Sequence, residues 1–193
     1  MNDGEGTRSE LSAGPRATRR KALLLGVAAA GGAVAAAGSA PTAMAQQRDE
    51  ELVGGLLALE QIVAVAYEAA IERGLLERRL QLVTKLFRDQ EREHVEALSS
   101  ALRALGGEPR APADAADVPG LDGARTAKGI LGVLIDLERK SIAAYYEAQQ
   151  HLEDRRLLRT AASIMANEGQ HGVVLRQAAG RPPIPSAFAT GEE

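Results

Sequence analysis

The pattern Glu-x-x-His occurs twice in this chain, with the two copies 77 residues apart. A single Glu in an apolar stretch precedes each copy by roughly 30 residues. In chain order, the six residues are Glu60, Glu91, His94, Glu138, Glu168 and His171. The 193 residues contain three histidines, and two of them belong to this pattern. A feature repeated in this way indicates that one structural unit is used twice.

Both copies lie on a stripe of apolar residues that has the spacing of a helix. Residues three apart on a helix share a face, so the Glu and the His of each copy point to the same side. The stripes alternate steps of four and three, which is typical of the inward face of a helical bundle. The first stripe is Leu80, Thr84, Phe87, Glu91, His94, Leu98 and Ala101, and the second is Leu157, Ala161, Ile164, Glu168, His171, Leu175 and Ala178. The segments around the two single Glu residues match at a shift of 78, which predicts a duplicated helical hairpin.

Composition and helix-ending residues predict four helices. Aromatic residues make up only 3% of the chain, and Ala, Leu, Glu and Arg dominate, so intrinsic propensity favours helix almost throughout. Asp49 is the expected N-cap of the first helix, and Gly74 is its expected C′ glycine. The four expected helices span residues 49–74, 76–105, 126–152 and 154–179.

The connections between these helices predict their directions. Two connections are short, so helices one and two, and helices three and four, are expected to be antiparallel neighbours. The connection between helices two and three has about 20 residues and contains Pro109, Pro112 and Pro119. A connection of that length allows a crossover that leaves helix three parallel to helix two. The predicted fold is all-α: an antiparallel four-helix bundle at 46–180, with a long crossover between helices two and three and a C-terminal tail at 181–193.

Residues 1–45 have the three-part layout of a signal peptide. Basic residues at 19–21 precede an apolar stretch at 22–40, and a small-x-small cleavage site ends at Ala45. The basic region resembles the twin-arginine export motif, although Ala22 stands where a bulky Phe is usual. We therefore expect a bacterial protein that is exported to the periplasm or the extracellular space. The alternative is an uncleaved membrane anchor, to which the Ala- and Gly-rich stretch is poorly suited.

Charge and cysteine content exclude several classes of protein. The whole chain has a formal net charge of −3, and the part after residue 45 has 18 basic and 23 acidic side chains. That balance does not fit a nucleic-acid-binding surface, so no nucleic acid is expected as a partner. The chain has no cysteine, which excludes disulfides, iron–sulfur clusters and a rubredoxin-type iron site.

The six residues of the repeated pattern have the chemistry of a dinuclear metal site. An ionised carboxylate buried alone is very costly, and four of them repel one another. Two divalent cations would neutralise the four negative charges. Imidazole mixed with carboxylate suits iron or manganese, with zinc as a common substitute. We expect two iron ions, with manganese or zinc as alternatives; the competing hypothesis is a bundle that has kept the pattern without binding metal.

The ordered set of four Glu and two His residues resembles the ferritin-like di-iron superfamily, which includes bacterioferritins and rubrerythrins. The resemblance covers nearly the whole chain after the signal. It implies that Glu91 and Glu168 bridge the two metals. It also implies that the single Glu of each half and the His of the same half are terminal ligands, as Glu60 with His94 and Glu138 with His171.

The same resemblance suggests residues that support these ligands. Tyr67 and Tyr145 each follow a single Glu by seven positions, a spacing seen in bacterioferritins, and are expected to hydrogen-bond to ligands or to pack in the core. Gln90 and Asn167 precede the two motifs, where family members often have an acidic residue that accepts the N–H of the opposite His. The third histidine, His151, lacks a Glu partner at the same spacing and is expected at the surface.

Two functions remain open from the sequence. The first is an enzyme that oxidises iron(II) or reduces O2 or peroxide, with an external reductant and a homodimer both left open. The second is a non-catalytic stress or desiccation-related protein with a structural or vestigial metal site, because the segment 184–191 resembles that secreted subgroup. An iron-storage cage is disfavoured because the tail is too short for a fifth helix. A rubrerythrin-type peroxidase with its own rubredoxin-type donor is excluded by the lack of cysteine.

Overall fold

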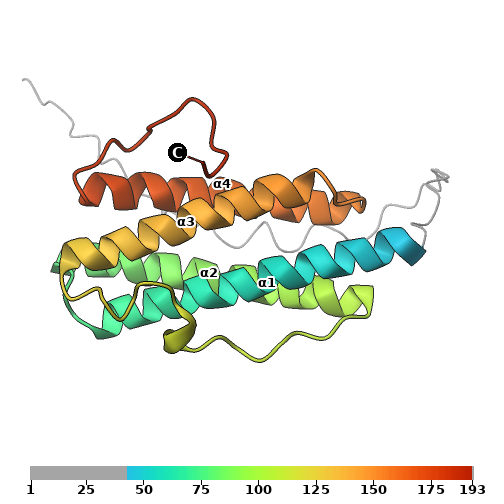
Figure 1. Cartoon of the computed structure of the whole chain (residues 1–193), viewed down its shortest axis with the longest axis horizontal. Helices are drawn as coiled ribbons and strands as arrows, with labels where there is room; N and C mark the ends of the chain where they lie inside the picture. Colours follow the sequence, from blue (N-terminus) through green and yellow to red (C-terminus); the bar gives the residue numbers. More distant parts are fainter. Residues whose placement is uncertain (1–42, 193) are drawn as a thin grey trace, which may run out of the picture. The chain divides into compact units, whose positions relative to one another are not determined.

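The computed structural model describes residues 43–192, and it is all-α over that range, as the sequence predicts (Figure 1). The predicted signal peptide lies outside the described residues up to position 42, and residues 43–45 form the start of the first helix. A single 3₁₀ turn, η2, interrupts the crossover at Ala115–Asp117. The four long helices are α1 (Ala43–Glu72), α2 (Arg78–Leu105), α3 (Ala127–Gln149) and α4 (Arg155–Ala178).

The helices form two hairpins, with α1 packed along α2 and α3 packed along α4. Figure 1 shows the crossover returning to the end of the bundle where α2 begins, so that α3 runs parallel to α2 as predicted. The crossover is held against the bundle because Val118, Leu121 and Ala124 are buried in the core. In addition, the guanidinium of Arg73 donates to the carbonyl oxygen of Ala124 at 2.9 Å. The long connection is therefore an ordered part of the fold.

The helix ends follow from local sequence. Gly106 has a φ of 96° at the end of α2, where its N–H donates to the carbonyl of Arg103. Gly74 has a φ of 62° after α1, which confirms its prediction as a C′ glycine. Thr126 and Asp154 cap the N-termini of α3 and α4 with their side-chain oxygens. Each of these four residues marks where one of the four helices stops or starts.

The prediction that Asp49 caps the first helix is wrong. The helix begins at Ala43, and Asp49 lies within it with only 1% of its surface exposed. Its two carboxylate oxygens accept the backbone N–H groups of Glu153 and Asp154, at 2.9 and 3.0 Å. Asp49 therefore does not cap its own helix. Its side chain links α1 to the turn that precedes α4.

Two apolar clusters fill the bundle, and the six pattern residues lie between them. One cluster surrounds Tyr67 and Phe87, and the other surrounds Leu98 and Tyr145. On each of the four helices, the Glu or Glu-x-x-His falls between residues of the first cluster and residues of the second. The bundle therefore holds a buried polar layer between two apolar layers.

Helix α1 is apolar on more than one face because it packs against both α2 and α3. It is the one helix within residues 43–192 whose length and composition would allow it to cross a bilayer. In this fold it contributes Glu60 and a large share of the core, including Val63, Ala66 and Tyr67, which are fully buried. The burial of these residues accounts for its composition.

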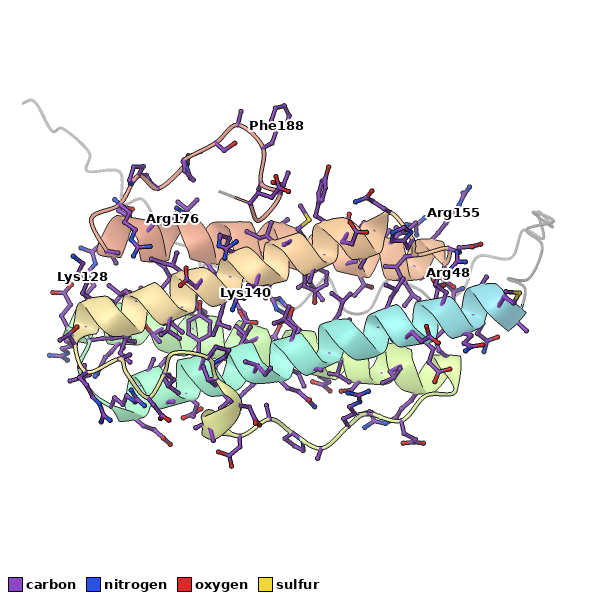
Figure 2. All side chains as sticks on the ribbon, viewed as in Figure 1. Arg48, Lys128, Lys140, Arg155, Arg176 and Phe188 are labelled. Carbon is purple, nitrogen blue, oxygen red and sulfur yellow. The ribbon has the colours of Figure 1, made fainter. Side chains whose placement is uncertain are left out.

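The C-terminal tail folds back on the second hairpin. Figure 1 shows it leaving the end of α4, arching outward and returning to the middle of that helix. The guanidinium of Arg139 on α3 donates to the carbonyl oxygen of Gly191 at 2.7 Å. Phe188 lies at the outer bend, 78% exposed, and points away from the bundle (Figure 2). The tail is thus anchored near its end and not at its bend.

Candidate metal centre

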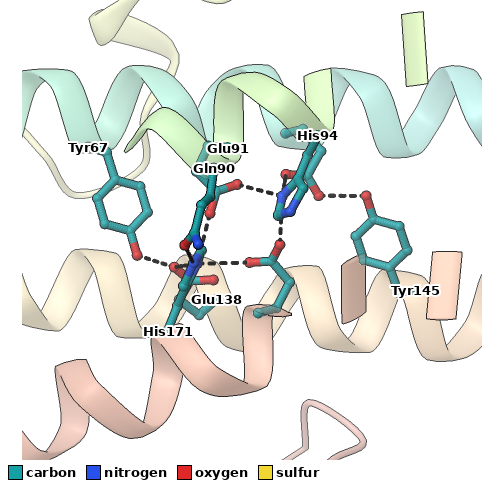
Figure 3. Close-up of polar contacts among 9 residues, drawn as sticks. Tyr67, Gln90, Glu91, His94, Glu138, Tyr145 and His171 are labelled. Carbon is teal, nitrogen blue, oxygen red and sulfur yellow. Dashed lines mark hydrogen bonds and ion pairs between the residues drawn. The ribbon is translucent and has the colours of Figure 1, made fainter. Parts of the chain in front are cut away.

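The structure brings all six predicted ligand residues together in the polar layer (Figure 3). They form two groups of four, and within each group one potential ligand atom per residue lies within 4.8 Å of the others. Both groups include Glu91 and Glu168. The first group adds Glu60 and His94, and the second adds Glu138 and His171. The bridging role that the resemblance implies for the two shared residues, and the terminal role for the other four, stay predictions.

The first group surrounds the Nδ1 atom of His94. This nitrogen lies 3.0 Å from Glu168 Oε1, 3.3 Å from Glu91 Oε2 and 3.4 Å from Glu60 Oε2. All three carboxylates are fully buried, whereas the imidazole of His94 keeps 9% of its surface exposed. His94 is therefore the most exposed of the six residues.

The second group surrounds the Nδ1 atom of His171. This nitrogen lies 3.0 Å from Glu91 Oε1, 3.3 Å from Glu138 Oε1 and 3.7 Å from Glu168 Oε2. Neither the histidine nor any of these carboxylates has more than 1% of its surface exposed. The second group is therefore more deeply buried than the first.

Two tyrosines tie the halves of the bundle together at the cluster. The hydroxyl of Tyr67 on α1 donates to Glu138 on α3, and the hydroxyl of Tyr145 on α3 donates to Glu60 on α1 at 2.6 Å. Each tyrosine therefore bonds to the single Glu of the opposite helix and not to the Glu of its own. Both rings are fully buried, and burial raises the pKa of each phenol well above its usual value. Both hydroxyls thus remain protonated donors.

The two histidines differ in what supports them. Gln90 accepts a hydrogen bond from His171 Nε2 through its side-chain oxygen, at 2.8 Å. The structure does not bring Asn167, the matching residue of the second half, into hydrogen-bonding contact with His94 within the described range. Phe87 stacks on the ring of His171, with centroids 4.0 Å apart, and this support was missed from the sequence. Ile164 occupies the matching position in the second half of the repeat. The sequence signal for this support is therefore an aromatic residue in one half where the other half has an aliphatic one.

The electrostatics of the cluster favour bound protons at several of its residues when no metal is present. Burial raises the pKa of Glu60 and Glu138 well above the usual range for a carboxyl. Burial would lower the pKa of the histidines, but the surrounding carboxylates raise it to about 12 for His94 and about 11 for His171. Burial also opposes ionisation of Glu168, yet contacts with Glu138 and both imidazoles lower its pKa to about 2.

The donor set fits a metal better than it fits protons. Several side-chain atoms of the cluster are buried without a properly aligned hydrogen bond, which native proteins normally avoid, although most of them lie 3.0–3.7 Å from an ion-pair partner. They are Glu60 Oε2, Glu91 Oε1, Glu138 Oε2, Glu168 Oε1 and Oε2, and His171 Nδ1. Metal coordination would satisfy all of these atoms, and two divalent cations would balance four carboxylates. The structure therefore supports a metal site at this cluster.

Comparison with known proteins agrees with the fold. The family model for the ferritin-like domain matches residues 48–181. The chain belongs to the ferritin-like domain family. No curated protein sequence matches the chain.

Two solved structures are similar to this ferritin-like protein. A conserved hypothetical protein from Mycobacterium tuberculosis is 17% identical with a TM-score of 0.65, over 75% of this chain and 99% of that one. The bacterioferritin of Desulfovibrio desulfuricans, described with its diiron site in different catalytic states, is 19% identical with a TM-score of 0.58. That match covers 73% of this chain and 84% of the bacterioferritin. At these identities the two structures support the fold alone.

The surface histidine of this ferritin-like protein is as the sequence predicts. His151 is half exposed at the end of α3, and its Nε2 lies 3.0 Å from Glu147 Oε1. It takes no part in either group of potential ligands. Two of the three histidines are therefore committed to the buried cluster, and the third belongs to the surface.

Proposed function

We propose that this ferritin-like protein binds two iron ions in the Glu/His cluster and uses them to reduce O2 or peroxide. The observation that carries the proposal is the pair of overlapping four-residue groups, which share Glu91 and Glu168 and lie in a closed layer of the bundle. A mixed set of imidazole and carboxylate ligands suits iron, with manganese and zinc as alternatives. The similar bacterioferritin is described as having a diiron site, which supports the choice of iron.

The reaction balances with two metal ions. When bound, two iron(II) ions supply one electron each, so that one peroxide and two protons become two water molecules and both irons end as iron(III). Repeated turnover then requires an external reductant, since the chain has no cysteine-bound redox centre of its own. A single cycle of iron(II) oxidation requires none.

The residues of this chain position and protect the donor atoms. Tyr67 and Tyr145 each fix a carboxylate of the opposite helix by donating to one of its oxygens, Glu138 Oε1 and Glu60 Oε1. The second oxygens, Glu138 Oε2 and Glu60 Oε2, are buried without a hydrogen-bond partner. Gln90 holds the Nε2 proton of His171, so its Nδ1 faces the carboxylates. The apolar clusters on both sides keep bulk water away.

Anaerobic loading with iron(II) followed by peroxide tests this proposal. Two irons per chain should bind, and the charge-transfer absorption of bound iron(III) should appear after peroxide is added. Glu91→Ala removes a carboxylate shared by both groups and should abolish that absorption. Glu93→Ala is the matched control, because Glu93 is an exposed neighbour on the same helix. An unchanged spectrum in a folded, loaded wild-type protein would contradict the proposal.

The non-catalytic alternative has a distinct outcome in the same experiment. If metal is only a structural clamp, loading should raise the thermal unfolding temperature without any reaction with peroxide. Glu91→Ala would then reduce that rise in temperature and would have no activity to remove. Metal analysis of natively purified protein identifies which ion is bound in either case.

We further propose that the protein is exported. The support is the order of basic residues, apolar stretch and small-x-small site within residues 1–45, which resembles a twin-arginine signal. A protein sent through that route travels folded, which suits a metal site loaded before export. Cell fractionation tests this, and replacement of Arg19 and Arg20 by Lys should keep the protein in the cytoplasm.

A further inference from the structure

A small cavity lies between α3, α4 and the C-terminal tail. It has a volume of about 100 Å³. Its floor is formed by Glu138 of α3 together with Gly169 and Gly172 of α4. Its roof is formed by the tail, including Pro183 and Ile184. The cavity therefore exists only because the tail folds back over the second hairpin.

The cavity and the cluster of potential ligands share one residue. Glu138 is a member of the second group and also lines the cavity, and its Oε2 is buried without a hydrogen-bond partner. Gly169 and Gly172 directly follow Glu168 and His171 in the chain. Neither the cavity lined by Gly54 and Gln61 nor the one lined by Leu75 and Val83 contains a residue of the cluster.

The floor is open because two of its residues have no side chain. A Cβ built on Gly169 or Gly172 would meet no atom within 4 Å, although Gly172 is itself buried. A helix normally covers such a position with a side chain that fills the space. Here α4 leaves the space empty immediately beside two potential metal ligands.

The tail closes the roof through a tight contact at Gly191. This residue has a φ of 81°, which favours glycine. A Cβ built on it would lie 2.5 Å from Ala143 Cβ and from the carbonyl oxygen of Arg139. Only glycine therefore allows the end of the tail to lie this close to α3.

We propose that this cavity is the route by which a small uncharged oxidant, O2 or hydrogen peroxide, reaches the metal centre. The proposal rests on the proposed function of the cluster. A cavity of about 100 Å³ has room for only a few molecules of the size of water. Its walls are mainly apolar and include Arg139 and Arg176, whose charge opposes the passage of metal cations. The walls therefore select for small neutral molecules.

Filling the cavity from its floor tests the route. Gly172→Leu places a side chain into the open space, where no neighbouring atom has to move for its Cβ. Gly132→Leu is the matched control, because Gly132 also lies within a helix and has open space at its Cβ but does not line the cavity. Both proteins are loaded with iron(II), and equal metal content is verified before any rate is measured.

Two rates are then measured for each loaded protein. One is the oxidation of iron(II) by peroxide, and the other is the association of nitric oxide, a neutral diatomic that reports access without turnover. Gly172→Leu should slow both by about tenfold or more, because its side chain would fill the cavity that is lined by Glu138 of the cluster. Gly132→Leu should stay within about twofold of the wild type for both, since a surface substitution away from the path changes little.

The outcomes separate this inference from the proposed function. If loaded wild-type protein binds nitric oxide but does not react with peroxide, the proposed function is wrong, and the nitric oxide rates alone decide the route. If Gly172→Leu matches the wild type in nitric oxide association at equal metal content, the route is wrong whether or not the protein is an oxidase. A wild-type protein that binds no iron would contradict both the proposed function and the proposed route.

A change at the roof gives an independent test. Gly191→Ala should displace the end of the tail from α3, because its Cβ would overlap Ala143. Nitric oxide association should then become faster, in the opposite direction to Gly172→Leu. An unchanged or slower rate in a variant whose tail has become accessible to protease would show that the tail does not cover the route.

Discussion

At the scale of single residues, the two halves of the cluster are not equivalent. His171 is fully buried, stacked on Phe87 and hydrogen-bonded to Gln90. His94 keeps 9% of its surface exposed, and Asn167 does not support it. The two groups of potential ligands therefore differ in burial and in hydrogen-bond support, and this difference can be measured.

The first prediction concerns Gln90. Gln90→Ala should weaken binding of one metal ion by about tenfold or more, because a residue that orients a ligand histidine contributes that much to affinity. Asn167→Ala is the control, since it occupies the matching position in the repeat without a hydrogen bond to His94. Anaerobic calorimetric titration with iron(II) measures both affinities. Equal losses in the two variants would show that the histidines are supported alike.

The second prediction concerns Tyr145. Tyr145→Phe removes the donor to Glu60 and leaves a buried oxygen without a partner, so the metal-free protein should lose about 1–3 kcal/mol of unfolding free energy. Tyr146→Phe is the control, because the Tyr146 side chain is 47% exposed and its change should stay within about 0.5 kcal/mol. Urea denaturation monitored by circular dichroism measures both. Similar values for the two variants would mean that the hydroxyl of Tyr145 stabilises nothing.

At the scale of helices, the sequence predicts most of the boundaries, and its one clear error is informative. Gly74, Thr126 and Asp154 end or begin helices as expected because their effects are local. Asp49 has the residue type of an N-cap, but the preceding residues continue the helix back to Ala43. Its partners lie more than 100 residues away along the chain. No local pattern could have identified them.

The third prediction tests this long-range contact. Asp49→Ala should destabilise the protein by about 1–3 kcal/mol, because it leaves two backbone N–H groups before α4 unpaired in a part-buried place. Asp49→Asn keeps one oxygen acceptor and should lose less. Glu51→Ala is the control, since Glu51 is exposed on the same helix and bonds only to Gln47. Thermal unfolding ranks the variants, and a larger loss for Glu51→Ala would refute the role given to Asp49.

The candidate site follows the same division between local and long-range information. Helical spacing and the repeat are sufficient to place the six ligand residues, because both act within one helix or through an exact sequence shift. The cross-helix bonds of Tyr67 and Tyr145 depend on how α1 packs against α3. The cavity depends on the fold of the tail and on Gly191. Neither feature leaves a periodic signal in the sequence.

At the scale of the whole molecule, the bundle encloses ionisable groups in its middle layer. Their charge can be neutralised by bound protons or by bound metal ions. Without metal, the raised pKa values of His94 and His171 show that both imidazoles hold protons in the neutral pH range. The raised pKa values of Glu60 and Glu138 favour their protonated forms as well. Metal ions must displace these protons, so uptake at neutral pH should release protons and should strengthen as pH rises.

The fourth prediction is that pH has a distinct effect on the stability of the metal-free protein. In the unfolded chain a histidine has a pKa near 6.5, whereas the folded values are about 12 for His94 and about 11 for His171. Between these limits the folded state holds more protons than the unfolded state, so the unfolding free energy should fall as pH rises above about 6.5. The stabilisation that the two protonated histidines provide is complete below that pH, and it is lost as pH rises through their pKa values in the folded protein.

Urea denaturation at pH 6.5, 8 and 9.5, with chelator present, measures this dependence. Metal-loaded protein is the control, because its ligands hold no exchangeable protons and its stability should not fall over the same range. Substitution of both histidines by Gln separates the cluster from the surface charges: the fall in stability between pH 6.5 and 9.5 should become smaller in the metal-free double variant. A metal-free wild-type protein whose stability stays constant or increases over this range would show that the cluster is not held together by protons.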